Sequence, residues 1–245
     1  MTHLYLIRHG EAVSNVEPIM GGMRGDTGLS PLGVQQAEAL RDRLIGTREI
    51  AADIVIASTL PRARQTAEII APAFDVPIFW EDDVQEMRVG EADGLHLDEF
   101  ARRYGVPDYE HDPYRPLAPG GESWAQFLLR VGTTLNRIAQ EHDGKTIAIV
   151  CHGGVIDGSL LCFFGLNTQS LPAVDFQTHN TSITHWERRA RPGRPPRWRL
   201  VAYNDAAHLR DIGAVEHTHW DELRAKPVIG SDTPAVPLPT EPPDA

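Results

Sequence analysis

The sequence predicts an α/β fold, a three-layer α/β/α sandwich around a mostly parallel sheet. Three short apolar runs, rich in Ile, Val and Leu, predict buried strands at His3–Ile7, Asp53–Ala57 and Thr146–Cys151. Segments in which apolar residues recur at helical spacing follow or separate these runs. Strands that alternate with helices are typical of a parallel sheet that is covered on both faces.

Three helices are predicted between and after these strands. Ser30 is a good N-cap and Pro31 suits the first helical position, and apolar residues then recur at helical spacing as far as Leu44. Residues 59–71 predict a second helix, and Glu122–Glu141 predicts a third, which has five apolar residues on one face.

One domain is expected over residues 1–226. Near its end, residues 181–187 and 197–203 predict an edge hairpin joined by the basic, proline-rich stretch 188–196. Residues of about 91–122 are polar and predict an insertion or lid, and the glycine-rich stretch 21–28 predicts a flexible loop at the rim of a pocket. Residues 227–245 are proline-rich and lack apolar periodicity, which favours a flexible tail.

The composition limits the kinds of partner. The net charge of -11 argues against broad binding to nucleic acid or to an anionic membrane, because both require a basic face. The first ten residues do not resemble a leader, and no stretch approaches the roughly 18 apolar residues of a membrane span. We therefore expect a cytoplasmic protein with Cys151 and Cys162 reduced, while its oligomeric state cannot be predicted.

Basic side chains follow each of the predicted strands. The first strand leads into Arg8 and His9, the second into Ser58 with Arg62 one turn further on, and the third into His152. Because the carboxyl ends of parallel strands meet at one edge of the sheet, these side chains should lie close together. Arginine presents a fork of donors to phosphate, and the helix amino terminus near Ser58 adds N–H donors, so the set predicts a phosphate site.

Histidine in such a site can act as a nucleophile. A neutral imidazole can attack phosphorus, which divides hydrolysis into two steps and requires an acid for the leaving oxygen. Glu86 is our candidate, although Asp82, Asp83 and Glu91 are close in sequence. Nearby arginines should lower the pKa of His9, but they also favour an ionised Glu86 until the substrate's charge offsets them. We therefore expect the phosphorylation step to have its rate optimum on the acid side of neutral.

Five segments, in this order, resemble the histidine phosphatase superfamily, which includes the cofactor-dependent phosphoglycerate mutases. They are Leu6–Glu11 with Asn15; Leu29–Gly33 with Gln36 and Ala37; Ser58–Ala63 with Gln65–Ala67; Glu86 with Gly90, Glu91 and Gly94; and Val150–Gly154. Together they cover most of the chain from Leu4 to Asn204. An ordered set is far more specific than a lone Arg-His-Gly. The resemblance implies a phosphoglycerate mutase-like fold with no metal and no cofactor.

The resemblance also implies roles for individual residues. His9 would form a phosphohistidine, and Glu86 would be the proton donor and then the base that activates water. Asn15 would add a hydrogen bond to the substrate. The groups implied around the phosphoryl oxygens are Arg8, Arg62, His152 and Gly153, and a looser match assigns a supporting role to Asn180, Thr181 and Ser182.

Three functions fit these residues. The first is a phosphomonoesterase that acts on a small-molecule phosphate ester, because Pro119–Ser123 followed by a helix resembles the phosphatase branch. The alternative is a phosphoglycerate mutase, which Arg102 and Arg103 in the insertion keep open. The second alternative is an inactive member that binds phosphorylated ligands. The residues do not predict which phosphorylated substrate would bind.

Overall fold

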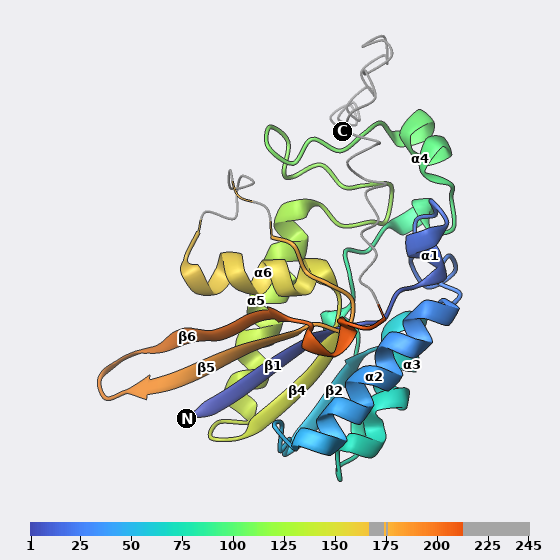
Figure 1. The fold of residues 1–245 in the computed structure, drawn as a ribbon. Helices are drawn as coiled ribbons and strands as arrows, with labels where there is room; N and C mark the ends of the chain where they lie inside the picture. Colours follow the sequence, from blue (N-terminus) through green and yellow to red (C-terminus); the bar gives the residue numbers. More distant parts are fainter. Residues whose placement is uncertain (167–173, 175, 213–245) are drawn as a thin grey trace.

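The computed structural model describes residues 1–166, 174 and 176–212, which form a six-stranded sheet in the order β3-β2-β4-β1-β5-β6 (Figure 1). The strands are β1 (Thr2–Arg8), β2 (Ile54–Ser58), β3 (Ile78–Glu81), β4 (Thr146–Cys151), β5 (Ile183–Arg191) and β6 (Arg194–Asp205). The first four pair in parallel, and β5 and β6 add antiparallel pairs at one edge. The predicted mostly parallel sheet is confirmed.

Helices cover both faces of this sheet (Figure 1). On one face lie α2 (Pro31–Thr47) and α3 (Pro61–Ile70), and on the other lie α5 (Trp124–Glu141) and α6 (Gly153–Phe164). The short helices α1 (Val13–Val16) and α4 (Leu97–Tyr104) lie beyond the ends of the strands (Figure 1). Successive side chains of a strand point to opposite faces, so Leu4 and Leu6 pack in the core cluster under α5 and α6. Ile7 instead packs against Leu40 and Leu44 of α2 on the other face. The predicted three-layer sandwich is therefore correct.

The helices predicted at 59–71 and 122–141 hold to within two residues, and the first helix continues past Leu44 to Thr47. The Ser30 hydroxyl accepts a hydrogen bond from the Gly33 amide at 3.0 Å, as an N-cap should. The third helix begins at Trp124, two residues later than predicted, because Ser123 and Gln126 form a capping box there. Glu122 therefore lies outside the helix, and its side chain is free to bind elsewhere.

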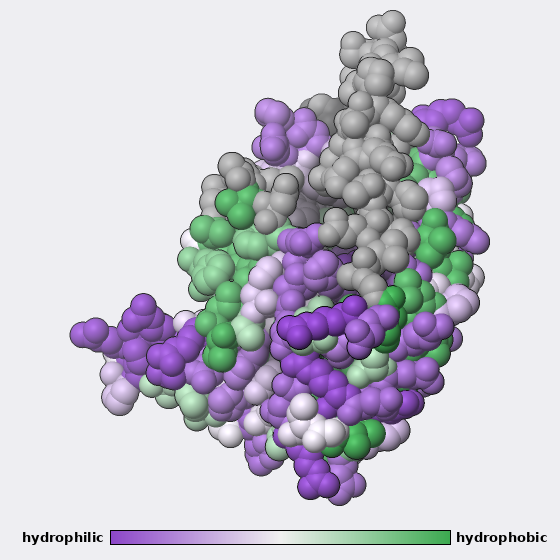
Figure 2. All heavy atoms as spheres, in the orientation of Figure 1, coloured by the Kyte–Doolittle hydropathy of each residue, from purple (hydrophilic) through white to green (hydrophobic). Residues whose placement is uncertain are grey.

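The edge hairpin is longer than predicted. Most of the stretch predicted as a connection, 188–196, is strand, and only two residues separate β5 from β6. Gly193 adopts a positive φ of 66° in this turn, a conformation that glycine adopts without steric cost. Arginines face each other across the two strands, and Figure 2 shows a hydrophilic surface at the hairpin tip.

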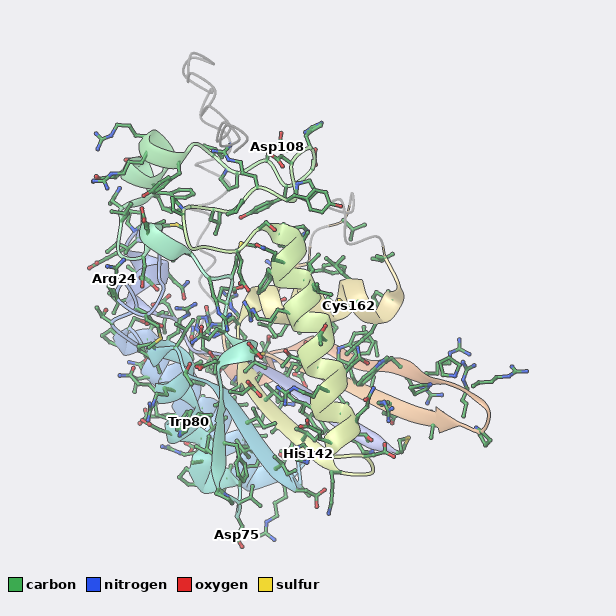
Figure 3. All side chains as sticks on the ribbon, turned by 180° about the vertical axis from the view of Figure 1, so that it is seen from behind. Arg24, Asp75, Trp80, Asp108, His142 and Cys162 are labelled. Atoms are coloured by element: carbon green, nitrogen blue, oxygen red, sulfur yellow. The ribbon has the colours of Figure 1, made fainter. Side chains whose placement is uncertain are left out.

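The segment at 91–122 contains more apolar structure than its composition predicts. It includes α4 and forms a third core cluster, in which Phe100 and Leu97 pack with Met20. In Figure 3, Asp108 of this segment lies at the opposite end of the molecule from Asp75 and His142, which precede β3 and β4. The segment therefore lies beyond the carboxyl ends of the strands, next to the predicted site.

Two further observations concern the predicted tail and membrane-spanning helices. The predicted tail at 227–245 and the expected domain end at 226 fall outside the described residues. Within the described part of the chain, no helix is long and apolar enough to cross a membrane.

Candidate active site

The register of β1 with β4 brings the two motif histidines together. Arg8 pairs with Cys151 in parallel register, so the next residues of the two strands, His9 and His152, leave the sheet side by side. The His9 amide donates to the Cys151 carbonyl at 3.0 Å, which extends the pairing by one residue. The imidazole centroids are 5.1 Å apart and their planes are inclined by 57°. Two segments separated by more than half of the chain thus share one site.

A close backbone approach fixes the turn that follows His9. A Cβ on Gly10 would collide with the carbonyl of Gly33, and a Cβ on Gly33 would collide with the carbonyl of Glu11. Only glycine fits at both positions. The Gly10 amide also donates to the Thr66 hydroxyl at 3.0 Å, so α2 and α3 both hold this turn.

Hydrogen bonds define the tautomer of His9. Its Nδ1 lies 2.6 Å from the Gly10 carbonyl, which can only accept, so Nδ1 carries the proton. Nε2 then keeps its lone pair and accepts a hydrogen bond from Nε of Arg62 at 3.1 Å. Burial lowers the pKa of His9 well below its usual value, and the charges of Arg62 and Arg8 lower it further. The imidazole is therefore neutral, with a lone pair directed into the site.

Asp26 holds Arg62 in place. The Arg62 Nη1 group donates to Asp26 Oδ2 at 2.8 Å and to the Gly21 carbonyl at 2.9 Å. The Asp26 side chain is 0% exposed and that of Arg62 is 6% exposed, so this is a buried ion pair. The Arg62 amide also donates to Asp26 Oδ2 at 3.1 Å. The amino terminus of α3 was predicted to donate N–H groups to phosphate. For the Arg62 amide this prediction is wrong, because that amide already donates to the Asp26 carboxylate.

Sequence reasoning missed Asp26. The glycine-rich loop that contains it was expected to be flexible, but hydrogen bonds that Asp26 and Asp93 accept tie it to neighbouring segments. Asp26 Oδ1 accepts from the Gly28 amide at 2.9 Å, two residues along, which is an Asx turn. An Asp two residues before a glycine was the signal available in the sequence.

Arg8 and His152 have buried nitrogen atoms without partners. Among the described residues, Arg8 Nε and His152 Nδ1 are buried and make no hydrogen bond, although Arg8 Nη1 donates to the Thr178 carbonyl. Such orphaned atoms are costly unless a ligand binds them. His152 Nε2 lies 2.7 Å from the Ser58 hydroxyl, and burial lowers the pKa of His152, with Arg62 adding to the effect.

Glu86 lies at the amino terminus of α6. One carboxylate oxygen accepts from the Gly154 amide and the other from the Met87 amide, each at 3.0 Å. Burial lowers the pKa of Arg8, and the nearby charge of Glu86 opposes part of this shift. A Cβ on Gly153 would lie 3.6 Å from Arg8 Nε, so the first residue of α6 also borders the site. The Glu86 carboxylate therefore lies at the start of α6, close enough to Arg8 for their charges to interact.

The residues with looser matches support the backbone of His9. Asn180 Nδ2 donates to the His9 carbonyl at 3.0 Å, and the Thr181 amide donates to the same carbonyl at 3.2 Å. The Ser182 carbonyl accepts from the Arg8 amide.

Asn15 is placed differently from the rest. Its Oδ1 accepts from the Ala12 amide at 2.9 Å, inside the short helix α1, and no hydrogen bond joins it to the other predicted site residues in the described part of the chain. No group of three or more His, Cys, Asp or Glu side chains that could hold a metal ion occurs among the described residues.

The sequence matches a family that this arrangement suits. The model of the histidine phosphatase superfamily (branch 1) matches residues 4–206. The chain therefore belongs to this superfamily, as the resemblance implied.

Its relatives include both phosphatases and mutases. The metal-independent phosphoserine phosphatase of Arabidopsis thaliana is 29% identical over 223 residues, covering 88% of this chain and 87% of that protein. The probable phosphoglycerate mutase GpmB of Erwinia tasmaniensis is 28% identical over 229 residues, covering 91% of this chain and all of that protein. A solved structure of a mutant phosphoserine phosphatase from Entamoeba histolytica with phosphoserine has a TM-score of 0.67 at 27% identity, covering 85% of this chain and 100% of that chain.

Proposed function

We propose that this protein is a metal-independent phosphomonoesterase that hydrolyses small phosphate esters through a phosphohistidine at Nε2 of His9. The observation that carries the proposal is the fixed tautomer of His9, since the Gly10 carbonyl holds the proton on Nδ1 and leaves Nε2 with the lone pair that can attack once Arg62 Nε turns to the substrate. The unpartnered nitrogens of Arg8 and His152 support a phosphoryl site beside it.

In the first step, the Nε2 lone pair bonds to phosphorus while the bond between phosphorus and the ester oxygen breaks. The leaving oxygen takes the proton of the Glu86 carboxyl group. The imidazole ring becomes positively charged, and the Gly10 carbonyl stabilises it by accepting from Nδ1–H at 2.6 Å. Arg62, which donates to Nε2 in the free protein, would donate to a phosphoryl oxygen instead.

In the second step, the Glu86 carboxylate accepts a proton from water as the water oxygen attacks phosphorus. The N–P bond breaks, inorganic phosphate leaves, and both His9 and Glu86 return to their starting protonation states. Charge stabilisation comes from guanidinium and imidazole groups in this scheme, so activity should survive excess EDTA.

Rapid quenching during turnover of a ³²P-labelled phosphate ester tests the intermediate. We expect an acid-labile, base-stable adduct on His9 and none in His9→Ala, whose turnover should fall by several orders of magnitude. A His9→Ala variant that hydrolyses the ester at the normal rate would refute the proposal. Lack of hydrolysis of any ester by the wild type would favour the inactive ligand-binding alternative.

The mutase alternative depended on Arg102 and Arg103. Both ion-pair with Glu99 on the exposed side of α4, and the Arg102 side chain is 76% exposed. This placement favours the phosphatase, because basic residues that grip a substrate carboxylate should face the pocket. Interconversion of phosphoglycerate isomers by the pure protein, at a rate above that of hydrolysis, would establish a mutase instead.

The relatives and the site together support a proposal for the substrate class. Relatives that act on phosphoserine, and a site built around one phosphoryl group, support a small-molecule phosphate monoester. A panel of phosphorylated metabolites that includes phosphoserine and 3-phosphoglycerate, ranked by kcat/KM, would identify the leaving group.

A further inference from the structure

We propose that Arg130 and Glu122 are positioning residues that hold Glu86 at the reacting group. This inference rests on the proposed role of Glu86 as the proton donor. Apart from Glu86, no predicted site residue in the described part of the chain forms a side-chain hydrogen bond with Arg130 or Glu122. The mechanism above does not use either residue.

Arg130 binds the backbone of Glu86 and of the residues just before it. Its Nη1 donates to the carbonyls of Asp83 at 2.9 Å and Gln85 at 3.0 Å, and its Nη2 donates to the carbonyl of Glu86 at 3.2 Å. This stretch follows β3 and lies outside the sheet, so no strand pairing fixes it. One guanidinium group from α5 therefore provides hydrogen bonds that a strand would otherwise supply.

Glu122 holds Arg130 in this position. The two side chains form a bidentate pair, with Arg130 Nε 2.7 Å and Nη2 2.6 Å from the two carboxylate oxygens. Arg130 is 9% exposed and Glu122 is 13% exposed, so water competes weakly with this pair. Glu122 Oε2 also accepts from the Arg88 amide at 2.9 Å. The ion pair thus fixes the backbone from Asp83 to Arg88.

The position of this segment decides where the acid lies. The Glu86 carboxylate reaches the Gly154 amide at 3.0 Å, at the start of α6. A shift of about 1 Å in the 83–88 backbone would carry the carboxyl group away from α6, and misplacement of that size can cost about 100-fold in rate. An acid that is out of place matters only for leaving groups that need its proton.

Leaving-group dependence separates positioning of Glu86 from general damage to the fold. We would measure kcat/KM, which reports the phosphorylation step, for 2,4-dinitrophenyl phosphate and for an alkyl phosphate. The variants are Arg130→Met, Arg130→Lys and the milder Glu122→Gln, with Glu86→Gln as the reference for loss of the acid. Arg137→Met is the matched control, because Arg137 lies on the same helix and pairs with Glu81 instead of the 83–88 backbone.

Loss of acid catalysis typically costs about 100-fold or more. We therefore expect Arg130→Met to lose about 100-fold on the alkyl ester but under about threefold on the dinitrophenyl ester. Arg130→Lys, which cannot reach three carbonyls, should show the same selective loss, and Glu122→Gln a smaller one. Arg137→Met should behave like the wild type on both esters. If Arg130→Met does not fold, the other two variants carry the test.

Two outcomes would overturn the inference. Equal losses on both esters would indicate general damage, and no loss would show that Glu86 finds its place without the ion pair. If Glu86→Gln shows selective loss and the Arg130 and Glu122 variants do not, only the positioning inference fails. If Glu86→Gln itself shows no selective loss, the assignment of the acid fails.

Discussion

Replacing Asp26 with asparagine should remove the charge that compensates Arg62 while keeping the shape of the side chain. The carboxylate accepts three hydrogen bonds, from the amides of Arg62 and Gly28 and from Arg62 Nη1. In Asp26→Asn, an amide nitrogen would have to face N–H donors, or one donor would be left unpaired. Because both side chains are almost fully buried, water cannot replace the lost partner.

The expected cost is large for a single atom change. Breaking a buried ion pair by removing one partner typically costs about 3–5 kcal/mol, because it leaves an uncompensated buried charge. The free energy of unfolding of a domain is only about 5–15 kcal/mol. Arg62 Nε also donates to the nucleophilic nitrogen of His9, and a displacement of about 1 Å would lower kcat/KM about 100-fold.

Urea unfolding at pH 7 and kcat/KM on an aryl phosphate measure the two effects. Asp93→Asn is the matched control, because Asp93 accepts from amides of the same loop but does not contact Arg62. The double variant Asp26→Asn with Arg62→Met removes both charges, so it should recover most of the stability while remaining inactive. An unfolding free energy within about 1 kcal/mol of the wild type for Asp26→Asn would refute this reasoning.

Three further predictions follow from the site. In Ser58→Ala, His152 Nε2 loses its hydrogen-bond partner at 2.7 Å, so we expect kcat/KM to fall about tenfold and inhibition by vanadate to weaken. Unchanged inhibition by vanadate would show that Ser58 does not orient the His152 ring. In Gly154→Ala, the new Cβ would collide with Glu86 Oε1, so hydrolysis of alkyl esters should fall more than that of dinitrophenyl esters. His9 and His152 have pKa values below 6.5 in the folded state, so below about pH 6.5 the unfolded chain binds more protons. As the pH is lowered below about 6.5, the free energy of unfolding should therefore fall by up to about 1.4 kcal/mol per pH unit for each histidine. The slope should be shallower in His152→Gln.

Elements with strong periodicity were predicted well. The apolar runs that became β1, β2 and β4, and the N-cap at Ser30, are local patterns whose physical cause lies within the segment itself. Four of the strands and α-helices were not predicted: β3, α6 and the short helices α1 and α4. β3 has only four residues, and two of them, Phe79 and Trp80, are exposed, so it lacks a pattern of burial. The apolar residues of α6 follow two glycines, and a short apolar run of this kind does not distinguish helix from strand.

For the site, too, the features that depend on local sequence were predicted and those that depend on distant contacts were not. Arg8, His9 and His152 stand at the ends of strands or directly after them, and Arg62 stands in the first turn of α3, which follows β2. Their meeting at one edge therefore follows from the parallel sheet. The partner of each of these groups could not be predicted. Ser58 and Thr178 contact His152 and Arg8 through strand register and loop geometry, which have no signature in composition or spacing. The spacing of Asp26 and Gly28 indicates a turn, but it does not indicate that Asp26 pairs with Arg62.

The sequence by itself determined the kind of protein, a sandwich with arginine and histidine at the carboxyl edge of its sheet, because periodicity and strand-end residues are local properties. Only the tertiary structure decided which nitrogen of His9 carries the proton and which carboxylate neutralises Arg62. It also decided that Glu122 lies before α5 and pairs with Arg130. Each of these depends on atoms a few ångströms apart that come from distant segments. A hydrogen bond needs that distance and direction, and folding alone supplies them.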